Sequence, residues 1–250
     1  MNNTLQTHQQ PVIIFDWDDT LLNAGKLLSE TQAQAITEIL KESVRYPFTE
    51  AWTAPTQAAL RQHAGHRFKE KIIPRIMPQI DATSPLHQAW IEDAYQRFKY
   101  YYQQAAKHLF PGIKTMLTEL KQAGHILCIA SNKSRDLLEE ELEITELITL
   151  FTLIKAGDDA ALNGNAKPAP DMINHIQSAF DTNTRFVMVG DRPYDIEAAR
   201  SSTAHTQTLT IGIRTKTSFT LNADIELSSA AEITTEMIHA LIQEHTSANS

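Results

Sequence analysis

Short runs of consecutive hydrophobic residues recur along the chain, and several of them end at a polar cluster. The first run, Val12-Ile13-Ile14-Phe15, leads straight into Asp16. A continuous apolar run of this length is typical of a strand that is buried on both faces of a parallel sheet. Later runs predict four more strands, over residues 125–130, 151–155, 185–189 and 208–212.

The segment between the first two predicted strands has helical periodicity. Apolar residues recur at helical spacing from about Ser29, and Ser29 with Gln32 forms a predicted capping box. Pro55 and Pro85 are expected in the first turns of two further helices. No part of residues 23–108 has a convincing strand pattern, so we predict a helical insert here.

After residue 108, predicted helices alternate with the predicted strands. This alternation is the pattern of a parallel sheet with crossover helices. We therefore expect an α/β fold, with a core made of residues 1–22 and 109–250 and a helical insert made of residues 23–108. The predicted helices of the core open at 111–112, span about 136–142, begin near 170, span about 194–200 and lie within 231–242.

Composition narrows the class of protein further. The chain has 250 residues, 42% of them hydrophobic, and a formal net charge of −8. It shows no run of Lys or Arg that would track a nucleic acid, and no apolar stretch long enough to span a membrane. We therefore expect a soluble, cytoplasmic protein that binds neither nucleic acid nor membrane. The single cysteine, Cys128, lies inside an apolar run and is expected to be a buried small hydrophobe.

Two carboxylates follow the first predicted strand. If the backbone stays extended, Asp16 and Asp18 point to the same side and Trp17 to the other. Like charges held this close cost energy unless a cation compensates them, and Mg²⁺ suits a pair of carboxylates beside a phosphate. We expect Asp16 to attack phosphorus and Asp18 to carry the proton. The alternative is an Asp-rich turn that simply closes a strand.

Further polar groups follow the other predicted strands. Ser131 and Asn132 can donate hydrogen bonds to phosphoryl oxygens, and Lys167 supplies a cation. Asp191 and Asp195 follow the fourth strand, and at least one of them is expected to complete a metal site. Structural alternatives are a helix cap, a solvated loop lysine and an acidic helix start. All these groups fall where an α/β sheet gathers ligands, beyond the carboxyl ends of its strands.

In this order the motifs resemble those of the haloacid dehalogenase superfamily of phosphatases, over essentially the whole chain. The nearest subgroup is similar to phosphoglycolate phosphatase and its sugar-phosphate relatives. The family pattern reads Asp-x-Asp-x-Thr, then Ser or Thr, then Lys, then Gly-Asp-x-x-x-Asp. The matching residues are Asp16, Asp18, Thr20, Ser131, Lys167, Gly190, Asp191 and Asp195.

The resemblance implies a Rossmann-like parallel sheet with helices on both faces and an inserted all-α cap of the C1 type. It implies an aspartyl-phosphate at Asp16 and acid–base chemistry at Asp18. It also implies phosphate contacts from Thr20, Ser131 and Lys167, and Mg²⁺ held by Asp16, Asp191 and the backbone carbonyl of Asp18, with Asp195 in support. The expected partner is a small phosphorylated metabolite, and the expected assembly is a monomer or homodimer.

Two positions depart from many relatives or vary among them. Asp19 stands where many relatives have glycine, and Arg192 occupies a variable position of the fourth motif. In the insert, a cluster of basic residues is expected either to meet an anionic group of the substrate or to form a solvated face. These residues are His66, Arg67, Lys69 and Lys71. A further group, Trp90, Tyr95, Phe98 and Tyr102, is expected to form the core of the insert.

Other activities are known on the same fold. A dehalogenase would have no use for Asp18, because its leaving group is not an oxygen. A phosphonatase would need a Schiff-base lysine from the cap, for which Lys69 and Lys71 are candidates. A phosphomutase would differ only in excluding water, and a binding protein would keep the site without turnover.

Overall fold

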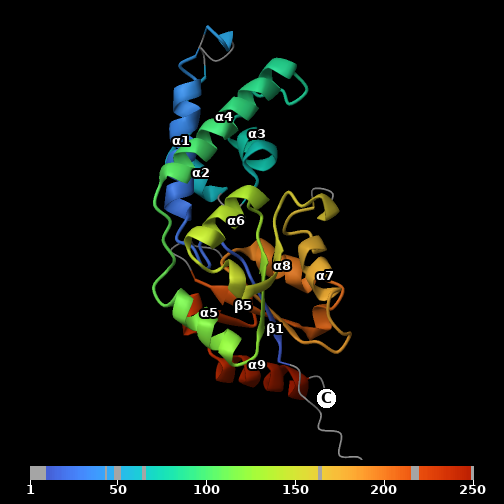
Figure 1. The fold of residues 1–250 in the computed structure, drawn as a ribbon. Helices are drawn as coiled ribbons and strands as arrows, with labels where there is room; N and C mark the ends of the chain where they lie inside the picture. The colour runs from blue at the N-terminus through green and yellow to red at the C-terminus, as the bar shows by residue number, and fades with distance from the viewer. Residues whose placement is uncertain are drawn as a thin grey trace, which may run out of the picture.

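The computed structural model of the chain describes residues 10–42, 44–47, 52–63, 66–162, 165–214 and 220–248. Within them the core is a six-stranded sheet in the order β3-β2-β1-β4-β5-β6, and every neighbouring pair of strands is parallel (Figure 1). The strands are β1 Val12–Phe15, β2 Ile126–Ala130, β3 Phe151–Lys155, β4 Phe186–Gly190, β5 Thr208–Ile213 and β6 Ile225–Leu227. The predicted α/β fold with a Rossmann-like sheet is confirmed.

Helices cover both faces of the sheet, which explains why β1 is apolar throughout. Alternate side chains of a strand point to opposite faces. Ile13 and Phe15 pack into one cluster with residues of α5, α6 and α9, whereas Val12 and Ile14 pack into another with residues of α7 and α8. These helices are α5 Ile113–Gln122, α6 Arg135–Ile144, α7 Asp171–Gln177, α8 Pro193–Arg200 and α9 Thr235–Ala248.

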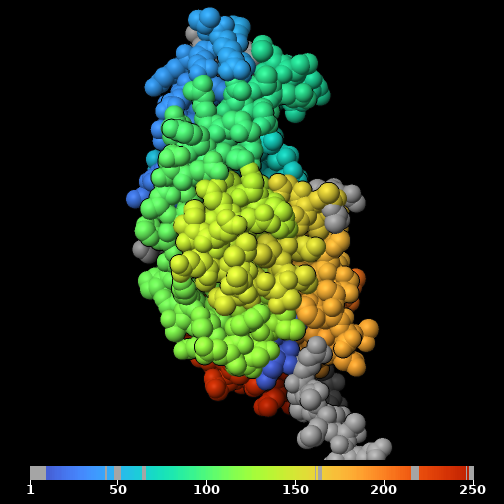
Figure 2. All heavy atoms as spheres, viewed as in Figure 1, coloured from blue at the N-terminus to red at the C-terminus, as the bar shows by residue number. Residues whose placement is uncertain are grey.

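The insert is helical in the described part of residues 23–108. It forms a lobe above the sheet in Figure 1, and Figure 2 shows this lobe stacked on the larger core. Its helices are α1 Gly25–Ile39, α2 Gln57–Gln62, α3 Ile73–Ile76 and α4 Pro85–Gln104, with a π-helical turn at Phe68–Ile72. Trp90, Phe98 and Tyr102 of α4 are buried as expected. Short 3₁₀ turns lie at Ile148–Leu150, Ala160–Leu162, His205–Gln207 and Ala230–Glu232.

The start of α1 differs from the prediction. The helix begins at Gly25, and Ser29 lies inside it with its hydroxyl donating to the Lys26 carbonyl, so the predicted capping box is wrong. The N–H of Gly25 is instead bound by the Asp19 carboxylate at 2.7 Å. Pro85 does open α4, whereas Pro55 precedes the N-cap of α2 and is not in its first turn.

The two chain segments that join the insert to the core lie side by side. Leu22 and Leu109 form an antiparallel bridge, and the N–H of Asn23 donates to the carbonyl of His108 at 2.9 Å. The predicted boundaries, after residues 22 and 108, fall at this crossing and remain a prediction. Among the described residues, no helix combines the length and the apolar character that a membrane span requires.

Candidate active site

The polar groups that follow the strands converge at the carboxyl edge of the sheet. The strand order reverses at β1 and β4, and a crevice at such a reversal is where α/β sheets bind ligands. Asp16 extends β1, with its N–H bonded to the Val189 carbonyl of β4 at 2.8 Å. Asp191 directly follows β4, and Ser131 directly follows β2. The topology therefore brings three of the predicted motifs to one place.

Lys167 joins this group from a loop and is fully enclosed. Its ammonium lies 2.6 Å from Asp16 Oδ1 and 2.6 Å from Asp195 Oδ1. The Asn132 amide holds the Lys167 backbone in both directions: Oδ1 accepts from the Lys167 N–H at 2.8 Å, and Nδ2 donates to the Lys167 carbonyl at 3.0 Å. Asn132 therefore fixes the loop that carries the lysine, while its predicted contact with phosphate stays a prediction.

Asp195 is held from two sides. Oδ1 pairs with Lys167, and Oδ2 accepts the backbone N–H of Arg192 at 3.0 Å. Gly190 makes room for it, because a Cβ at this position would lie 2.4 Å from the Cβ of Asp195. The glycine of the fourth motif is therefore required by the close approach of the Asp195 side chain.

Three buried carboxylates gather at this point. One oxygen from each of Asp16, Asp191 and Asp195 lies within 4.8 Å of the others. Burial raises the pKa of Asp191 well above its usual range, against the opposing effect of Arg192, and burial raises the pKa of Asp195 to about 7 although Lys167 opposes it. The nearby cations thus do not offset the cost of burying these charged carboxylates, and an oxygen-lined site of this kind fits a hard divalent cation.

Asp18 lies apart from this cluster and has a cation of its own. Its Oδ1 forms an ion pair with the Lys133 ammonium at 2.6 Å. Burial raises the pKa of Asp18 to about 7, although Lys133 opposes the shift. A carboxyl group with a pKa near neutrality is suited to giving and taking a proton.

Thr20 and Ser131 are placed differently from each other. The Thr20 hydroxyl is buried and faces two carboxylates, 3.4 Å from Asp191 Oδ1 and 3.5 Å from Asp16 Oδ2. Ser131 lines the cavity described below, and its hydroxyl accepts the N–H of Lys133 at 3.2 Å. Ser131 therefore lies on the cavity side of the site, whereas Thr20 does not line the cavity and contacts the carboxylates of Asp16 and Asp191.

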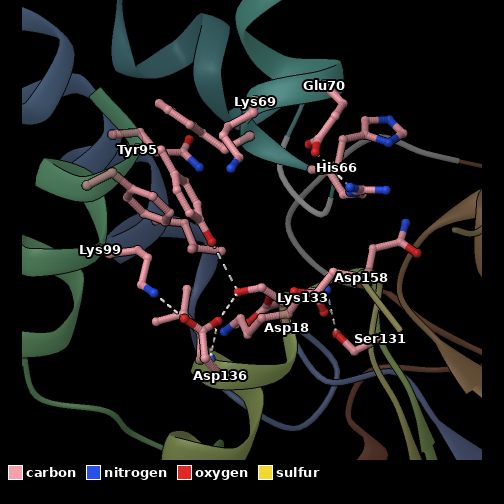
Figure 3. Close-up of a pocket in the computed structure, with 18 of the residues that line it drawn as sticks. Asp18, His66, Lys69, Glu70, Tyr95, Lys99, Ser131, Lys133, Asp136 and Asp158 are labelled. Carbon is pink, nitrogen blue, oxygen red and sulfur yellow. Dashed lines mark hydrogen bonds and ion pairs between the residues drawn. The ribbon is translucent and has the colours of Figure 1, made fainter. Parts of the chain in front are cut away.

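A cavity of about 280 Å³ lies between the core and the insert. Figure 3 shows Asp18, Ser131 and Lys133 on its core side, opposite residues of the insert that include Lys69 and Tyr95. Its lining also includes Asp16, Asn132, Gln32, His66, Arg67, Lys99 and Tyr194. The cavity thus opens directly onto both aspartates of the first motif.

Two of the four basic residues of the insert have acidic partners within the insert. Lys69 pairs with Glu92 at 2.9 Å and lies over the Tyr95 ring, while Arg67 pairs with Glu70 at 2.7 Å. Burial, reinforced by nearby cations, lowers the pKa of His66 to about 4. Lys71 is exposed and does not line the cavity. Tyr95, predicted as insert core, is partly buried and lines it.

Three residues of the site were not singled out as site residues in the sequence. Tyr194 lies between the lobes, its ring centroid 5.7 Å from Lys167 Nζ and 5.4 Å from the His66 ring. Lys133 and Glu141 form a buried ion pair behind Asp18. Lys133 and Tyr194 carry a sequence signal, since Lys133 directly follows Ser131-Asn132 and Tyr194 directly precedes Asp195. Glu141 lies on a helix whose pattern shows nothing of the cavity.

Comparisons with known proteins agree with this geometry. The family described as haloacid dehalogenase-like hydrolase matches residues 13–209. A phosphoglycolate phosphatase of Vibrio cholerae is 30% identical over 206 residues, which cover 80% of this chain and 84% of that protein. Pyrophosphatase PpaX of Listeria innocua is 26% identical over 80% of this chain and 82% of its own. A crystal structure of β-phosphoglucomutase from Clostridium difficile superimposes with a TM-score of 0.71 at 14% identity, over 95% of this chain and 99% of the other.

Proposed function

Because this chain belongs to the haloacid dehalogenase-like hydrolase family, we propose that it is a Mg²⁺-dependent phosphatase acting through an aspartyl-phosphate at Asp16. Its substrate is a small phosphate monoester of the phosphoglycolate or sugar-phosphate type. The observation that carries this proposal is the convergence of Asp16, which lines the cavity, with the buried Lys167, 151 positions later in the chain, at 2.6 Å. The names of the sequence relatives support a phosphatase.

The reaction proceeds in two steps. In the first, an oxygen of Asp16 forms a bond to phosphorus while the bond from phosphorus to the leaving oxygen breaks, and that oxygen takes a proton from Asp18. In the second, Asp18 takes a proton from water as the water oxygen bonds to phosphorus, and the bond to Asp16 breaks. Lys167 and the Ser131 hydroxyl stabilise the negative charge on the transferring group.

The donor set suits Mg²⁺. Asp16 and Asp191 would hold the ion together with the backbone carbonyl of Asp18, whereas both oxygens of Asp195 are already engaged by Lys167 and the Arg192 N–H. Asp195 therefore supports the site by orienting the lysine. A bound Mg²⁺ would offset the charge of the carboxylates and polarise the phosphoryl group.

The contacts of the cavity residues favour a phosphatase over a phosphonatase or a dehalogenase. A phosphonatase needs an uncharged cap lysine to form a Schiff base, and Lys69 is paired with Glu92. A dehalogenase has no need of Asp18 with its own buried lysine partner. A phosphomutase would differ only in excluding water, and the test below distinguishes it.

The test is release of inorganic phosphate from p-nitrophenyl phosphate and from a panel of small phosphate esters, with Mg²⁺, with EDTA, and for Asp16→Asn. We expect turnover that needs the metal and that falls at least about 10³-fold in Asp16→Asn. Acid-quenched enzyme should carry one phosphoryl group on the peptide that contains Asp16. Equal rates in wild type and Asp16→Asn would refute the nucleophile, and isomerised product without free phosphate would indicate a mutase.

Metal binding has its own readout without substrate. A ligand that binds only the folded protein raises its melting temperature. We expect added MgCl₂ to raise the melting temperature of the wild type and to have little effect on Asp191→Asn. An equal shift in both proteins would argue against a metal at this cluster.

A further inference from the structure

Each of the two aspartates of the first motif forms an ion pair with a different buried lysine. Lys167 pairs with Asp16, and Lys133 pairs with Asp18, each at 2.6 Å. The mechanism uses Lys167 but gives Lys133 no task. A buried lysine is costly unless its charge is paired, so an additional one beside a reacting carboxylate calls for an explanation.

The Lys133 ammonium has a complete set of partners. It forms an ion pair with Asp18 Oδ1 at 2.6 Å, and it donates hydrogen bonds to Glu141 Oε2 at 2.5 Å and to the Tyr102 hydroxyl at 2.9 Å. Its side chain is only 3% exposed. With three polar partners and little contact with water, the ammonium cannot move toward a ligand without losing one of these contacts.

Glu141 holds the lysine from behind. Its side chain is 1% exposed and also accepts from Trp17 Nε1 at 2.7 Å and from the Tyr102 hydroxyl at 2.5 Å. Trp17 lies between the two aspartates in sequence and is fully buried in the hydrophobic core. Glu141 therefore anchors both the lysine and the backbone segment that carries Asp18.

This arrangement leaves one oxygen of Asp18 for chemistry. Lys133 binds Oδ1, and among the described residues no hydrogen bond or ion pair involves Oδ2. Asp18 lines the cavity, and Figure 3 shows it beside Lys133 on the core side. A carboxyl group fixed through one oxygen presents the other in a constant direction, which is the geometry that proton transfer to a leaving oxygen requires.

We propose that Lys133, held by Glu141, is a positioning residue that fixes Asp18 for proton transfer and does not bind the phosphate itself. This inference rests on the proposed function, in which Asp18 protonates the leaving oxygen. It predicts a defect that depends on the leaving group. Esters with basic leaving oxygens need the proton, whereas those with acidic leaving groups depart without it.

The experiment measures kcat/KM, which reports the step that expels the leaving group, for alkyl phosphates, p-nitrophenyl phosphate and 2,4-dinitrophenyl phosphate. For Lys133→Met we expect a loss of about 10²-fold with alkyl phosphates and less than about 3-fold with 2,4-dinitrophenyl phosphate. Glu141→Gln, which keeps the size of the side chain, should show the same trend more weakly. The inhibition constant of inorganic phosphate should stay within about 2-fold of the wild type in both variants.

Lys107→Met is the matched control, because Lys107 lies over the same Tyr102 ring and donates to the Tyr102 carbonyl without contacting Asp18. It should keep kcat/KM for every substrate. Circular dichroism and thermal melting establish that the variants are folded, and Glu141→Gln carries the test if Lys133→Met does not fold.

An equal loss for all leaving groups, a parallel weakening of phosphate inhibition, or no loss at all would each overturn the inference. These outcomes are distinct from failure of the proposed function, which would appear as full activity in Asp16→Asn.

Discussion

At the scale of single residues, the site depends on side chains that hold other side chains. Asn132 is an example, because its amide bonds the Lys167 backbone twice while its neighbours Ser131 and Lys133 line the cavity. A contact of Asn132 with substrate phosphate remains a prediction. Its two hydrogen bonds to the Lys167 backbone are observed, so removal of the amide should affect both stability and activity.

Replacing Asn132 with Ala should loosen Lys167 and leave its buried backbone N–H and carbonyl without partners. We expect unfolding to become easier by about 1–3 kcal/mol and kcat/KM to fall by about 10-fold to 10²-fold, because a small misplacement of a catalytic group is costly. Urea denaturation and steady-state kinetics give the two values. Unchanged stability together with a raised KM alone would instead indicate that Asn132 only binds substrate.

At the scale of elements, the first connection to the insert is set by Asp19 and Gly25. Asp19 has a φ of 62°, a left-handed conformation that glycine adopts without strain. The Asp19 side chain makes two contacts that a glycine could not make. Its carboxylate accepts the N–H of Gly25 at the start of α1, and its Oδ2 lies 3.5 Å from Arg192 Nη2. A Cβ on Gly25 would fall 2.2 Å from Asp19 Oδ2. The two residues therefore constrain each other.

A double-mutant cycle tests this pairing. Gly25→Ala in the wild type should destabilise the protein by about 1–3 kcal/mol, because the new methyl group displaces the carboxylate. In an Asp19→Gly background the same change should be neutral or stabilising by up to about 1 kcal/mol, since alanine favours a helix over glycine. The free energy of unfolding in urea is the measurement. The same cost in both backgrounds would show that Asp19 is not the source of the constraint.

At the scale of the whole molecule, the insert and the core close on each other over the site. His66 of the insert packs against Tyr194 of the core, and Tyr194 in turn lies over Lys167. His66 is kept neutral by burial and by the positive charge of Arg75, which lower its pKa to about 4 from 6.5. The contact between the lobes is therefore sensitive to acid.

The sign of this effect follows from linkage. Because the folded pKa of His66 lies below the unfolded value, the unfolded chain takes the proton first, and stability present above about pH 6.5 is lost as the pH falls toward about 4. We expect the free energy of unfolding of the wild type to fall more between about pH 7.5 and pH 5 than that of His66→Gln. Metal-free urea titrations of both proteins measure the difference. Parallel pH profiles would show that His66 is not responsible.

The sequence by itself determined the strands of the core and the order of the motifs. Runs such as Val12–Phe15 are apolar because both faces of the sheet are covered by helices. A strand buried on both faces can therefore be predicted from its own consecutive residues. The three-residue strand β6 was missed because so short a segment shows no period. The start of α1 was missed because its N–H partner, Asp19, lies six positions away and outside any capping pattern.

Only the tertiary structure decided which charged residues of the site pair with one another. The pairings of Lys167 with Asp16 and of Lys133 with Asp18 join segments that are far apart in the chain, and Glu141, eight positions after Lys133, anchors that lysine from the next helix. For the basic residues of the insert, the sequence left open whether they meet an anionic group of the substrate or form a solvated face, and the structure shows Lys69 paired with Glu92 within the insert. The reason is physical: a residue pattern reports how much of a side chain is buried, whereas the partner of a buried charge is fixed by the packing of distant elements.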